Sequence, residues 1–256
     1  MVSVCMTTYN GELYLEEQIK SILSNIGPDD ELIVSDDGST DSTIDIINNF
    51  KDNRIKLIHH SKSSHYKFRF SYTTTNFSNA IKYATGDYIF LSDQDDVWEK
   101  DKVKKMLPLL EEYDLVVSDC SEVDSCLNIL YESHFDLVNA NTNVLRNIYK
   151  CSFLGCCMCF NKDLLNKIMP IPEDVPHDLW IGCVASLFGK IKLLEDKTLL
   201  YRRHDKNVSI TNSKILKQST SDNAAKLNTA KNSSCYMLSY RFVFIKRLIR
   251  RYLKLI

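Results

Sequence analysis

Short apolar segments alternate with longer amphipathic segments through the first hundred residues. The apolar segments are rich in β-branched and aromatic residues and are bounded by turn-forming residues, which is typical of buried strands. We predict strands at Val2–Met6, Glu31–Ser35, Ile55–His59 and Tyr88–Leu91. The intervening segments carry apolar residues at helical spacing, and we predict helices at Glu12–Asn25, Thr43–Phe50 and Asn76–Ala84. Strands that alternate with helices are typical of βαβ units, so the predicted fold class is α/β, a mixed and mostly parallel sheet flanked by helices.

The alternation is less regular in the second half of the chain. Here we predict strands at Leu115–Ser118, Lys190–Leu194 and Thr198–Tyr201, and a strand or buried segment at Ser152–Phe160. We predict helices at Val97–Glu112, Lys162–Ile168 and from His177 to about Phe188. Segments without clear periodicity are expected to be loops, and these are Ser61–Thr75, Ile129–Asn143 and the proline-rich Pro170–Pro176.

The C-terminal part of the chain differs from the rest in charge. From Lys206 onward the chain carries eleven Lys and Arg residues and one acid, so this part is basic while the remainder is acidic. We expect one domain over residues 1–206, then a mobile polar segment and a helix within residues 207–256. In that helix apolar residues recur on one side, namely Ile245, Leu248, Ile249, Tyr252 and Leu255, and bases fill the other, namely Lys246, Arg247, Arg250, Arg251 and Lys254. A basic amphipathic helix is typical of binding to an anionic membrane surface, and docking on its own domain is the alternative.

Composition places the chain among ordinary globular proteins. It has 256 residues with 44% hydrophobic and 25% charged residues, and a formal net charge of −1. Its nine cysteines form no regular framework, so buried reduced thiols in a cytosolic protein are expected. The N-terminus reads directly as a strand, and no run is long enough to span a bilayer. We therefore expect a cytoplasmic protein, peripheral on the inner face of the plasma membrane, without a nucleic-acid partner.

Polar residues follow three of the predicted strands. These loops are Thr8–Gly11, Asp36–Ser39 and Asp93–Asp96. In a parallel α/β sheet the carboxyl ends of the strands meet at one edge, where ligands bind. We therefore expect the three loops to form one site.

The loop after Leu91 holds three carboxylates within four residues. Side chains alternate along an extended backbone, so Asp93 and Asp95 can point the same way. Two converging carboxylates repel each other unless a cation lies between them, and hard oxygen ligands favour Mg²⁺ or Mn²⁺. The alternative is an Asx turn, with one of these acids as the N-cap of the next helix.

The same three blocks resemble glycosyltransferase family 2. They are Val4–Gly11, Val34–Asp41 and Gly86–Trp98, and two later segments, Pro176–Trp180 and Tyr201–Val208, are similar as well. The second of these carries Asp205 where the family more often has Gly. The resemblance implies an inverting enzyme with the GT-A fold, closest to bacterial enzymes that build O-antigen or capsule repeat units. It also implies a nucleotide-sugar half at residues 1–100 and an acceptor half at 101–206.

Carried over by position, the resemblance assigns roles to individual residues. Asp36 or Asp37 would accept the N3–H of uracil or thymine, and Asp178 would be the general base. Asp93 and Asp95 would bind ribose and a Mn²⁺ or Mg²⁺ cofactor, with His204 as a further metal ligand. The remaining residues assigned to nucleotide-sugar binding are Thr8, Tyr9, Asn10, Glu12, Gln94, Arg202 and Arg203.

The resulting hypothesis is transfer of a sugar from a UDP- or dTDP-sugar to a hydroxyl of a lipid-linked saccharide. One alternative is a nucleotidyltransferase of related fold, although the loop Thr7–Gly11 has neither the Gly-rich sequence nor the Lys or Arg that such an enzyme needs. The other alternative is a non-catalytic membrane-bound module. Donor sugar, acceptor, linkage and oligomeric state stay open.

Overall fold

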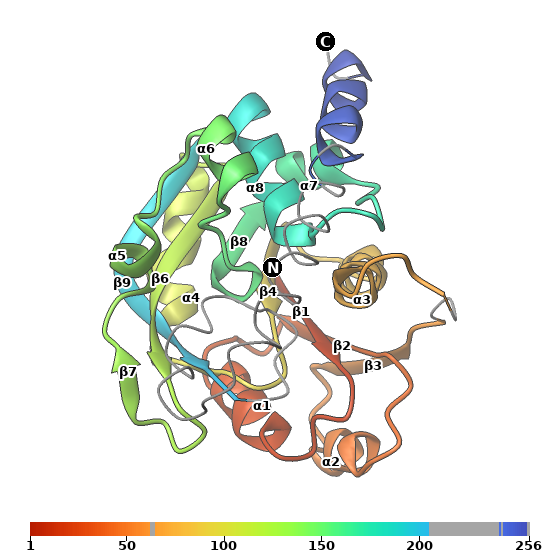
Figure 1. Cartoon of the computed structure of the whole chain (residues 1–256). Coiled ribbons are helices and arrows are strands. Elements are labelled where there is room, and N and C mark those ends of the chain that lie inside the picture. Colours follow the sequence, from red (N-terminus) through yellow and green to blue (C-terminus); the bar gives the residue numbers. More distant parts are fainter. Residues whose placement is uncertain (62–64, 205–240, 242, 255–256) are drawn as a thin grey trace, which may run out of the picture.

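The computed structural model describes residues 1–61, 65–204, 241 and 243–254. In this part of the chain nine strands form one mixed sheet in the order β3-β2-β1-β4-β8-β6-β9-β5, and β7 pairs with β6 (Figure 1). The strands are β1 (Val2–Thr8), β2 (Glu31–Asp36), β3 (Ile55–His59), β4 (Tyr88–Ser92), β5 (Val97–Trp98), β6 (Leu115–Val123), β7 (Ile129–Tyr131), β8 (Met158–Asn161) and β9 (Ile191–Arg202). The α-helices are α1 (Leu15–Leu23), α2 (Thr43–Asn49), α3 (Phe70–Lys82), α4 (Lys102–Met106), α5 (His134–Val138), α6 (Val144–Tyr149), α7 (Lys162–Ile168) and α8 (His177–Phe188). Short 3₁₀ helices lie at Leu107–Glu111 and Gly155–Cys157, and a C-terminal helix comprises residues 241 and 243–254.

The first half of the sheet is parallel, as the alternation of strands and helices predicts. β1 pairs in parallel with both β2 and β4, and β2 pairs in parallel with β3. Every residue of β1 and β2 is buried, which explains their nearly continuous apolar sequences. The chain passes from β1 outward to β3 and then returns to β4 on the other side of β1. Because crossovers are right-handed, α1 and α2 lie on one face and α3 lies on the other, as Figure 1 shows.

The second half of the sheet is mixed. β8 runs antiparallel to its neighbours β4 and β6, whereas β6 and β9 are parallel. The two short strands predicted near residues 190 and 200 are one twelve-residue strand, β9, whose pairing with β6 shifts register near Asp119. The predicted α/β class with a mixed sheet is confirmed.

Two predicted boundaries are wrong for a shared reason. The predicted helix Val97–Glu112 begins only at Lys102, because Val97 and Trp98 pair antiparallel with Leu200 and Leu199 of β9. The predicted loop Ser61–Thr75 instead contains the first turns of α3, which starts at Phe70. α3 buries Ser71, Thr74 and Asn76 as well as apolar residues, so its buried face does not show in the apolar pattern. In both cases long-range packing overrides the local signal.

The described part of the C-terminal helix packs against the body of the protein. Phe244 is fully buried, with its ring centroid 6.3 Å from that of Trp180, and Leu248 is buried beside it. Arg247 forms an ion pair of 3.0 Å with Asp174. Docking on its own domain, the alternative to membrane binding, is therefore observed for one side of this helix. Leu255 and the polar segment at 207–240 lie outside the described residues.

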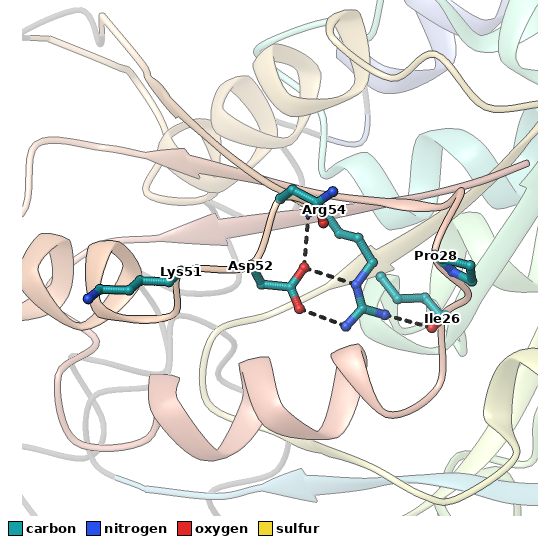
Figure 2. Close-up of a pocket in the computed structure, with 6 residues that line it drawn as sticks. Ile26, Pro28, Lys51, Asp52 and Arg54 are labelled. Carbon is teal, nitrogen blue, oxygen red and sulfur yellow. Dashed lines mark hydrogen bonds and ion pairs between the residues drawn. The ribbon is translucent and has the colours of Figure 1, made fainter.

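At the edge of the sheet where the strands begin, Arg54 connects neighbouring loops by hydrogen bonds. The guanidinium of Arg54 donates two bonds to Asp52 (3.0 and 2.8 Å) and one each to the carbonyls of Leu23 (3.0 Å) and Ile26 (2.8 Å), as Figure 2 shows in part. A shallow hollow of about 500 Å³ lies beside these residues. The Arg54 guanidinium beside this hollow is bonded to Asp52 and to two loop carbonyls, so Arg54 anchors the loops at this edge.

No helix in the described ranges is both long enough and apolar enough to span a bilayer.

Candidate active site

The loops after β1 and β2 are joined by hydrogen bonds at the carboxyl edge of the sheet. Asn10 has a φ of +48°, a left-handed conformation that Asn tolerates better than most residues. Its backbone N–H donates to the Ser39 hydroxyl (2.9 Å), and its side-chain oxygen accepts from the N–H of Thr40 (2.8 Å). Glu12 accepts from the N–H of Ser42 (3.0 Å). In this structure Asn10 and Glu12 therefore fix the two loops against each other.

Asp36, the last residue of β2, has its carboxylate bonded within the loop. It accepts from the hydroxyls of Thr8 (3.1 Å) and Ser39 (2.5 Å), and from the backbone N–H groups of Gly38 and Ser39 (both 2.9 Å). Asp36 is 1% exposed. In this structure the Asp36 carboxylate therefore shapes the loop after β2.

Asp37 is buried and paired with a histidine that the sequence analysis did not single out. Its backbone N–H donates to the carbonyl of Thr8 (2.9 Å), and its carboxylate lies 2.7 Å from Nδ1 of His60. The order of the predicted strands could have indicated this pair, because β3 pairs with β2 and ends at His59, opposite Asp36. The next residue of each strand then brings His60 beside Asp37.

Gln94 and Tyr9 connect the loops after β4 and β1. The Gln94 amide accepts from the Tyr9 N–H (2.9 Å) and donates to the Tyr9 carbonyl (3.1 Å). A Cβ at Gly11 would lie 2.3 Å from the Gln94 side-chain oxygen, so any other residue at position 11 would displace the Gln94 amide from Tyr9. The Tyr9 side chain remains half exposed at this edge. Gln94 therefore positions Tyr9 for any contact with a nucleotide.

Asp93 lies close to the other acids at the edge. Burial, together with the nearby charges of Asp95 and Asp178, raises the pKa of Asp93 to about 8. Asp178 is in the first turn of α8, far from Asp93 in sequence. Asp95, from the same motif, and Asp178, from a separate one, are thus near enough to Asp93 for their charges to disfavour its ionised form.

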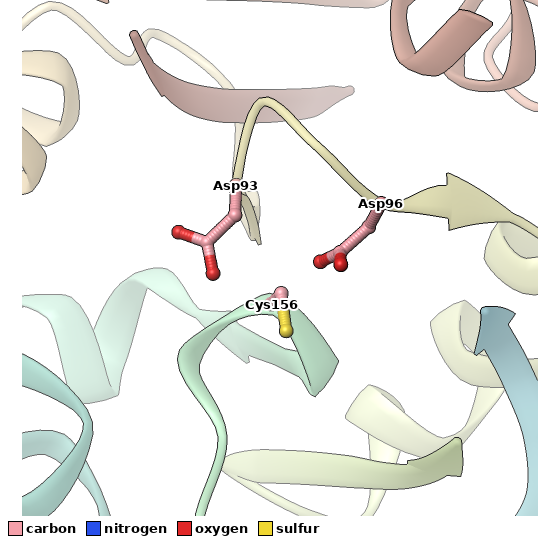
Figure 3. A group of neighbouring side chains, drawn as sticks. All are labelled: Asp93, Asp96 and Cys156. Carbon is pink, nitrogen blue, oxygen red and sulfur yellow. The ribbon is translucent and has the colours of Figure 1, made fainter. Parts of the chain in front are cut away.

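Asp96 and Cys156 lie beside Asp93 on the protein's interior side. One ligand atom from each of Asp93, Asp96 and Cys156 falls within 4.8 Å of the others, and Figure 3 shows the three side chains as neighbours. Asp96 accepts from the backbone N–H of Arg202 (3.0 Å), so it is not the N-cap that the alternative reading required. Its second carboxylate oxygen is buried and has no hydrogen-bond partner among the described residues. Burial, together with Asp95 and Asp93, raises the pKa of Asp96 well above its usual range.

Asp95 lies in direct contact with His204, and the sequence analysis expects both in a metal site. Oδ2 of Asp95 lies 2.8 Å from Nε2 of His204. Carboxylate and imidazole groups both bind Mn²⁺. The side chains of Asp95 and His204 are therefore of types that could hold a divalent cation. Cys156 is the poorer match among these side chains, because Mn²⁺ and Mg²⁺ prefer oxygen ligands to thiolate.

Arg202 has a different position from the one expected of a diphosphate ligand. It is 2% exposed, and its guanidinium donates to the carbonyls of Asp95 (2.8 Å) and Ser125 (2.7 Å) and to the carboxylate of Glu17 (2.5 Å). The guanidinium carbon also lies 4.4 Å from the ring centroid of Tyr14. Arg202 therefore holds the backbone of Asp95 in place. Arg203 lies nearby, with Nε 3.4 Å from buried Glu122.

The position of Asp178 depends on contacts between α3 and α8. The backbone N–H of His177 donates to the Thr74 hydroxyl (3.2 Å), and the His177 ring packs on Phe77 with centroids 4.3 Å apart. Burial lowers the pKa of His177, so its ring is neutral at physiological pH. One oxygen of Asp178 accepts from the Leu179 N–H (2.7 Å). α3 thereby fixes the start of α8 and the acid that follows it.

Comparisons with known proteins agree with this architecture. Residues 3–169 match the model of Glycosyl transferase family 2. The chain is 29% identical over 218 residues to the dTDP-rhamnosyl transferase RfbG of Shigella flexneri, covering 79% of this chain and 72% of that protein. It is 27% identical over 187 residues to the abequosyltransferase RfbV of Salmonella typhimurium, covering 65% of this chain and 53% of that protein.

Solved structures show the same fold. The crystal structure of S. aureus TarS with UDP-GlcNAc superposes with a TM-score of 0.62 at 23% identity, over 82% of this chain and 61% of that chain. The mannosyltransferase PcManGT of Pyrobaculum calidifontis, solved with GDP-Man and Mn²⁺, gives a TM-score of 0.58 at 18% identity, over 81% and 58% of the two chains. This chain therefore spans about three fifths of the length of these neighbours.

Fold and acidic edge together define an enzyme of the GT-A glycosyltransferase class. Since the family model matches more than half of its residues, the chain belongs to Glycosyl transferase family 2. Its relatives include rhamnosyl and abequosyl transferases, and this finding favours glycosyl transfer over nucleotidyl transfer and over a non-catalytic module.

Proposed function

We propose that this glycosyltransferase moves a sugar, with inversion, from a dTDP- or UDP-sugar to a hydroxyl of a lipid-linked saccharide during synthesis of a bacterial surface polysaccharide. The observation that supports the proposal is that Asp95 and Asp178 lie close enough to Asp93 for their charges to raise its pKa. The relatives support the donor class, because one is a dTDP-rhamnosyl transferase and one structural neighbour was solved with UDP-GlcNAc.

Asp178 is the proposed general base. The acceptor hydroxyl forms a bond to the anomeric carbon while the bond from that carbon to the diphosphate oxygen breaks, and the hydroxyl proton passes to the Asp178 carboxylate. Attack from the face opposite the leaving group inverts the anomeric configuration. A base in this role contributes roughly 10²–10⁴-fold in rate.

The remaining residues bind and orient the donor. Asp37, backed by His60, is the proposed acceptor for the N3–H of the base, and Thr8 and Tyr9 line the nucleoside. Asp93 is assigned to the ribose. A Mn²⁺ or Mg²⁺ ion held by Asp95 and His204 would neutralise the charge that develops on the leaving diphosphate.

The acceptor class implies work at the inner face of the plasma membrane. A lipid-linked saccharide stays at the bilayer surface, so the enzyme has to reach it there. The basic C-terminal helix supports this location, because an excess of Lys and Arg favours anionic lipid.

A thermal-shift screen of dTDP-, UDP- and GDP-sugars, with and without Mn²⁺, tests the proposal. A ligand at 100 times its Kd stabilises a protein by about 2.7 kcal/mol, which raises Tm by several degrees for a chain of this size. We expect a shift from a dTDP- or UDP-sugar that needs Mn²⁺ and is lost in Asp95→Ala. The matched control is Asp87→Ala, an exposed acid just before β4 at the opposite edge. A full shift in Asp95→Ala, or a shift from GDP-sugars alone, would contradict the proposal.

A further inference from the structure

Six of the thirteen large apolar side chains that are exposed among the described residues belong to two helices. Leu145 and Tyr149 of α6 are 74% and 73% exposed, and Ile249 and Leu253 of the C-terminal helix are 55% and 66% exposed. Ile245 and Tyr252 of the C-terminal helix are exposed as well. Side chains of this size seldom lie so open on a monomer in such number and proximity unless another surface covers them.

The two helices meet where these residues begin. The guanidinium of Arg241 donates to the carbonyl of Tyr149, and its carbon lies 5.2 Å from the centroid of the Tyr149 ring. Residues four apart lie on the same side of a helix. Ile245 and Ile249 are therefore on the same side of the C-terminal helix as Arg241, which contacts Tyr149 of α6. The exposed apolar residues of α6 and of the C-terminal helix are thus neighbours in one surface.

The C-terminal helix is held with this surface facing outward. Phe244 packs on Trp180, and Tyr252 packs on Phe188 with ring centroids 5.5 Å apart. Phe188 follows Trp180 on α8 by the same number of residues as Tyr252 follows Phe244 on the C-terminal helix. The two helices therefore run parallel, and the C-terminal helix leads away from the end of α8 that carries Asp178. Figure 1 shows it projecting from the body beside α7 and α8. The domain takes up one side of the helix, and its other apolar residues remain uncovered.

The charge around the apolar residues is positive. Exposed bases flank them on both helices, namely Arg146 and Lys150 at α6 and Lys246, Arg250 and Lys254 on the C-terminal helix. Asp174, an acid in contact with the C-terminal helix, is neutralised by Arg247. Apolar side chains that enter the headgroup region, amphipathic tyrosines at its level and flanking bases are the combination that binds an anionic bilayer.

We infer that α6 and the C-terminal helix form one composite docking surface for an anionic membrane. The inference rests on the membrane location in the proposed function, and it adds α6 to what the C-terminal charge alone indicates. A surface of this kind would also fix the orientation of the enzyme relative to the membrane, because the C-terminal helix is packed along α8. The membrane contact and Asp178 then belong to one rigid unit.

Vesicle binding by the full chain tests the inference. Co-sedimentation with vesicles of phosphatidylglycerol and phosphatidylcholine is compared for wild type, Leu145→Ser with Tyr149→Ser, and Ile249→Ser with Leu253→Ser. Each double variant should lose roughly tenfold or more in partitioning, since about 1.4 kcal/mol of lost apolar burial per tenfold is within reach of two large side chains. Ile129→Ser with Leu130→Ser removes two equally large exposed residues from β7 and should bind as wild type. Pure phosphatidylcholine vesicles should bind all variants weakly.

Additional measurements keep failure of the surface separate from failure of the enzyme. Leu145→Ser alone tests α6 without disturbing the contact between Tyr149 and Arg241, and it should lose several-fold in binding. The nucleotide-sugar thermal shift should be unchanged in every surface variant, whereas loss of that shift in wild type would refute the donor assignment and leave the vesicle result standing. Wild-type binding by both α6 variants would overturn the composite surface. So would concentration-dependent self-association that the α6 substitutions abolish while vesicle binding is retained, because the occupant would then be a second copy of the chain.

Discussion

The carboxylates at the two edges of the parallel strands differ in how fully the chain compensates their charge by hydrogen bonds. At the edge where the strands begin, Glu31 accepts from Ser3 (2.5 Å), Lys56 (2.6 Å) and Thr85 (2.7 and 2.9 Å). At the edge where they end, Asp96 has one buried carboxylate oxygen without a partner among the described residues. Burial alone would raise the pKa of Glu31, but its hydrogen bonds hold it at about 2, whereas Asp93 has a pKa near 8.

This difference separates anchoring from function. An acid whose charge is fully compensated by the chain stabilises the fold and has little capacity left for a ligand. Acids that crowd one another without compensation destabilise the free protein and are relieved by a bound cation. The predictions below test that division.

The largest expected effect is the loss of transfer in Asp178→Asn. The amide keeps the size of the side chain but cannot take the acceptor proton, so kcat should fall by roughly 10²–10⁴-fold. Calorimetry of nucleotide-sugar binding in Mn²⁺ should give a Kd close to that of wild type. Retained activity would show that another group is the base, and Asp163→Asn on exposed α7 serves as the matched control.

At the opposite edge, Glu31→Gln should destabilise the fold by about 1–3 kcal/mol at pH 7, because it weakens three buried hydrogen bonds and the contact with Lys56. The folded pKa of Glu31 lies below its ordinary value of 4.5. Its stabilisation is therefore present above about pH 4.5 and is lost as the pH falls toward 2. Urea unfolding of both proteins should show a difference that is constant from pH 7 to 5 and shrinks below pH 4.

Glu16→Gln provides the control for this measurement. Glu16 is exposed and pairs only with Lys20 four residues later on α1, so its replacement should change stability by less than about 0.5 kcal/mol. A Glu31 variant as stable as this control would mean that the beginning edge is not an anchor.

Much of the fold and of the site was predictable because the relevant signals are local. Each strand of the parallel half is a short apolar run, and each polar loop follows directly, so topology alone brings Asp37, Asp93 and Asp95 to one edge. α7 matches its predicted bounds, since Asn161 caps it by accepting from the Leu164 N–H (2.9 Å).

What the sequence did not show depends on contacts between distant segments. Arg202 resembles a diphosphate ligand in its motif, yet it is buried against Glu17 and Tyr14, which lie almost two hundred residues earlier. The sequence predicts a helix directly after Asp96. In the structure β5 follows it instead and pairs with β9, and this pairing brings the Arg202 N–H to the Asp96 carboxylate. His60 needs the register of β2 and β3 before it can be placed beside Asp37.

A smaller effect is expected for Arg54→Lys at the beginning edge. Lysine keeps the charge but cannot bridge Asp52 and the two carbonyls at once, so we expect a loss of about 1 kcal/mol. Transfer activity at 25 °C should not change, because these contacts lie at the end of the sheet remote from Asp178. A fall in kcat with unchanged unfolding free energy would link this hollow to the reaction.

The smallest effect, and the one with the opposite sign, is expected for Asp93→Asn. Replacing a carboxylate whose charged form is disfavoured by desolvation and by the charges of Asp95 and Asp178 should stabilise the metal-free protein by about 0.5–1 kcal/mol in EDTA at pH 7. Donor binding in Mn²⁺ should weaken in the same variant, so stability and binding move in opposite directions. Urea unfolding in EDTA beside calorimetry in Mn²⁺ measures both, and a variant less stable than wild type in EDTA would place Asp93 with Glu31 among the anchoring acids.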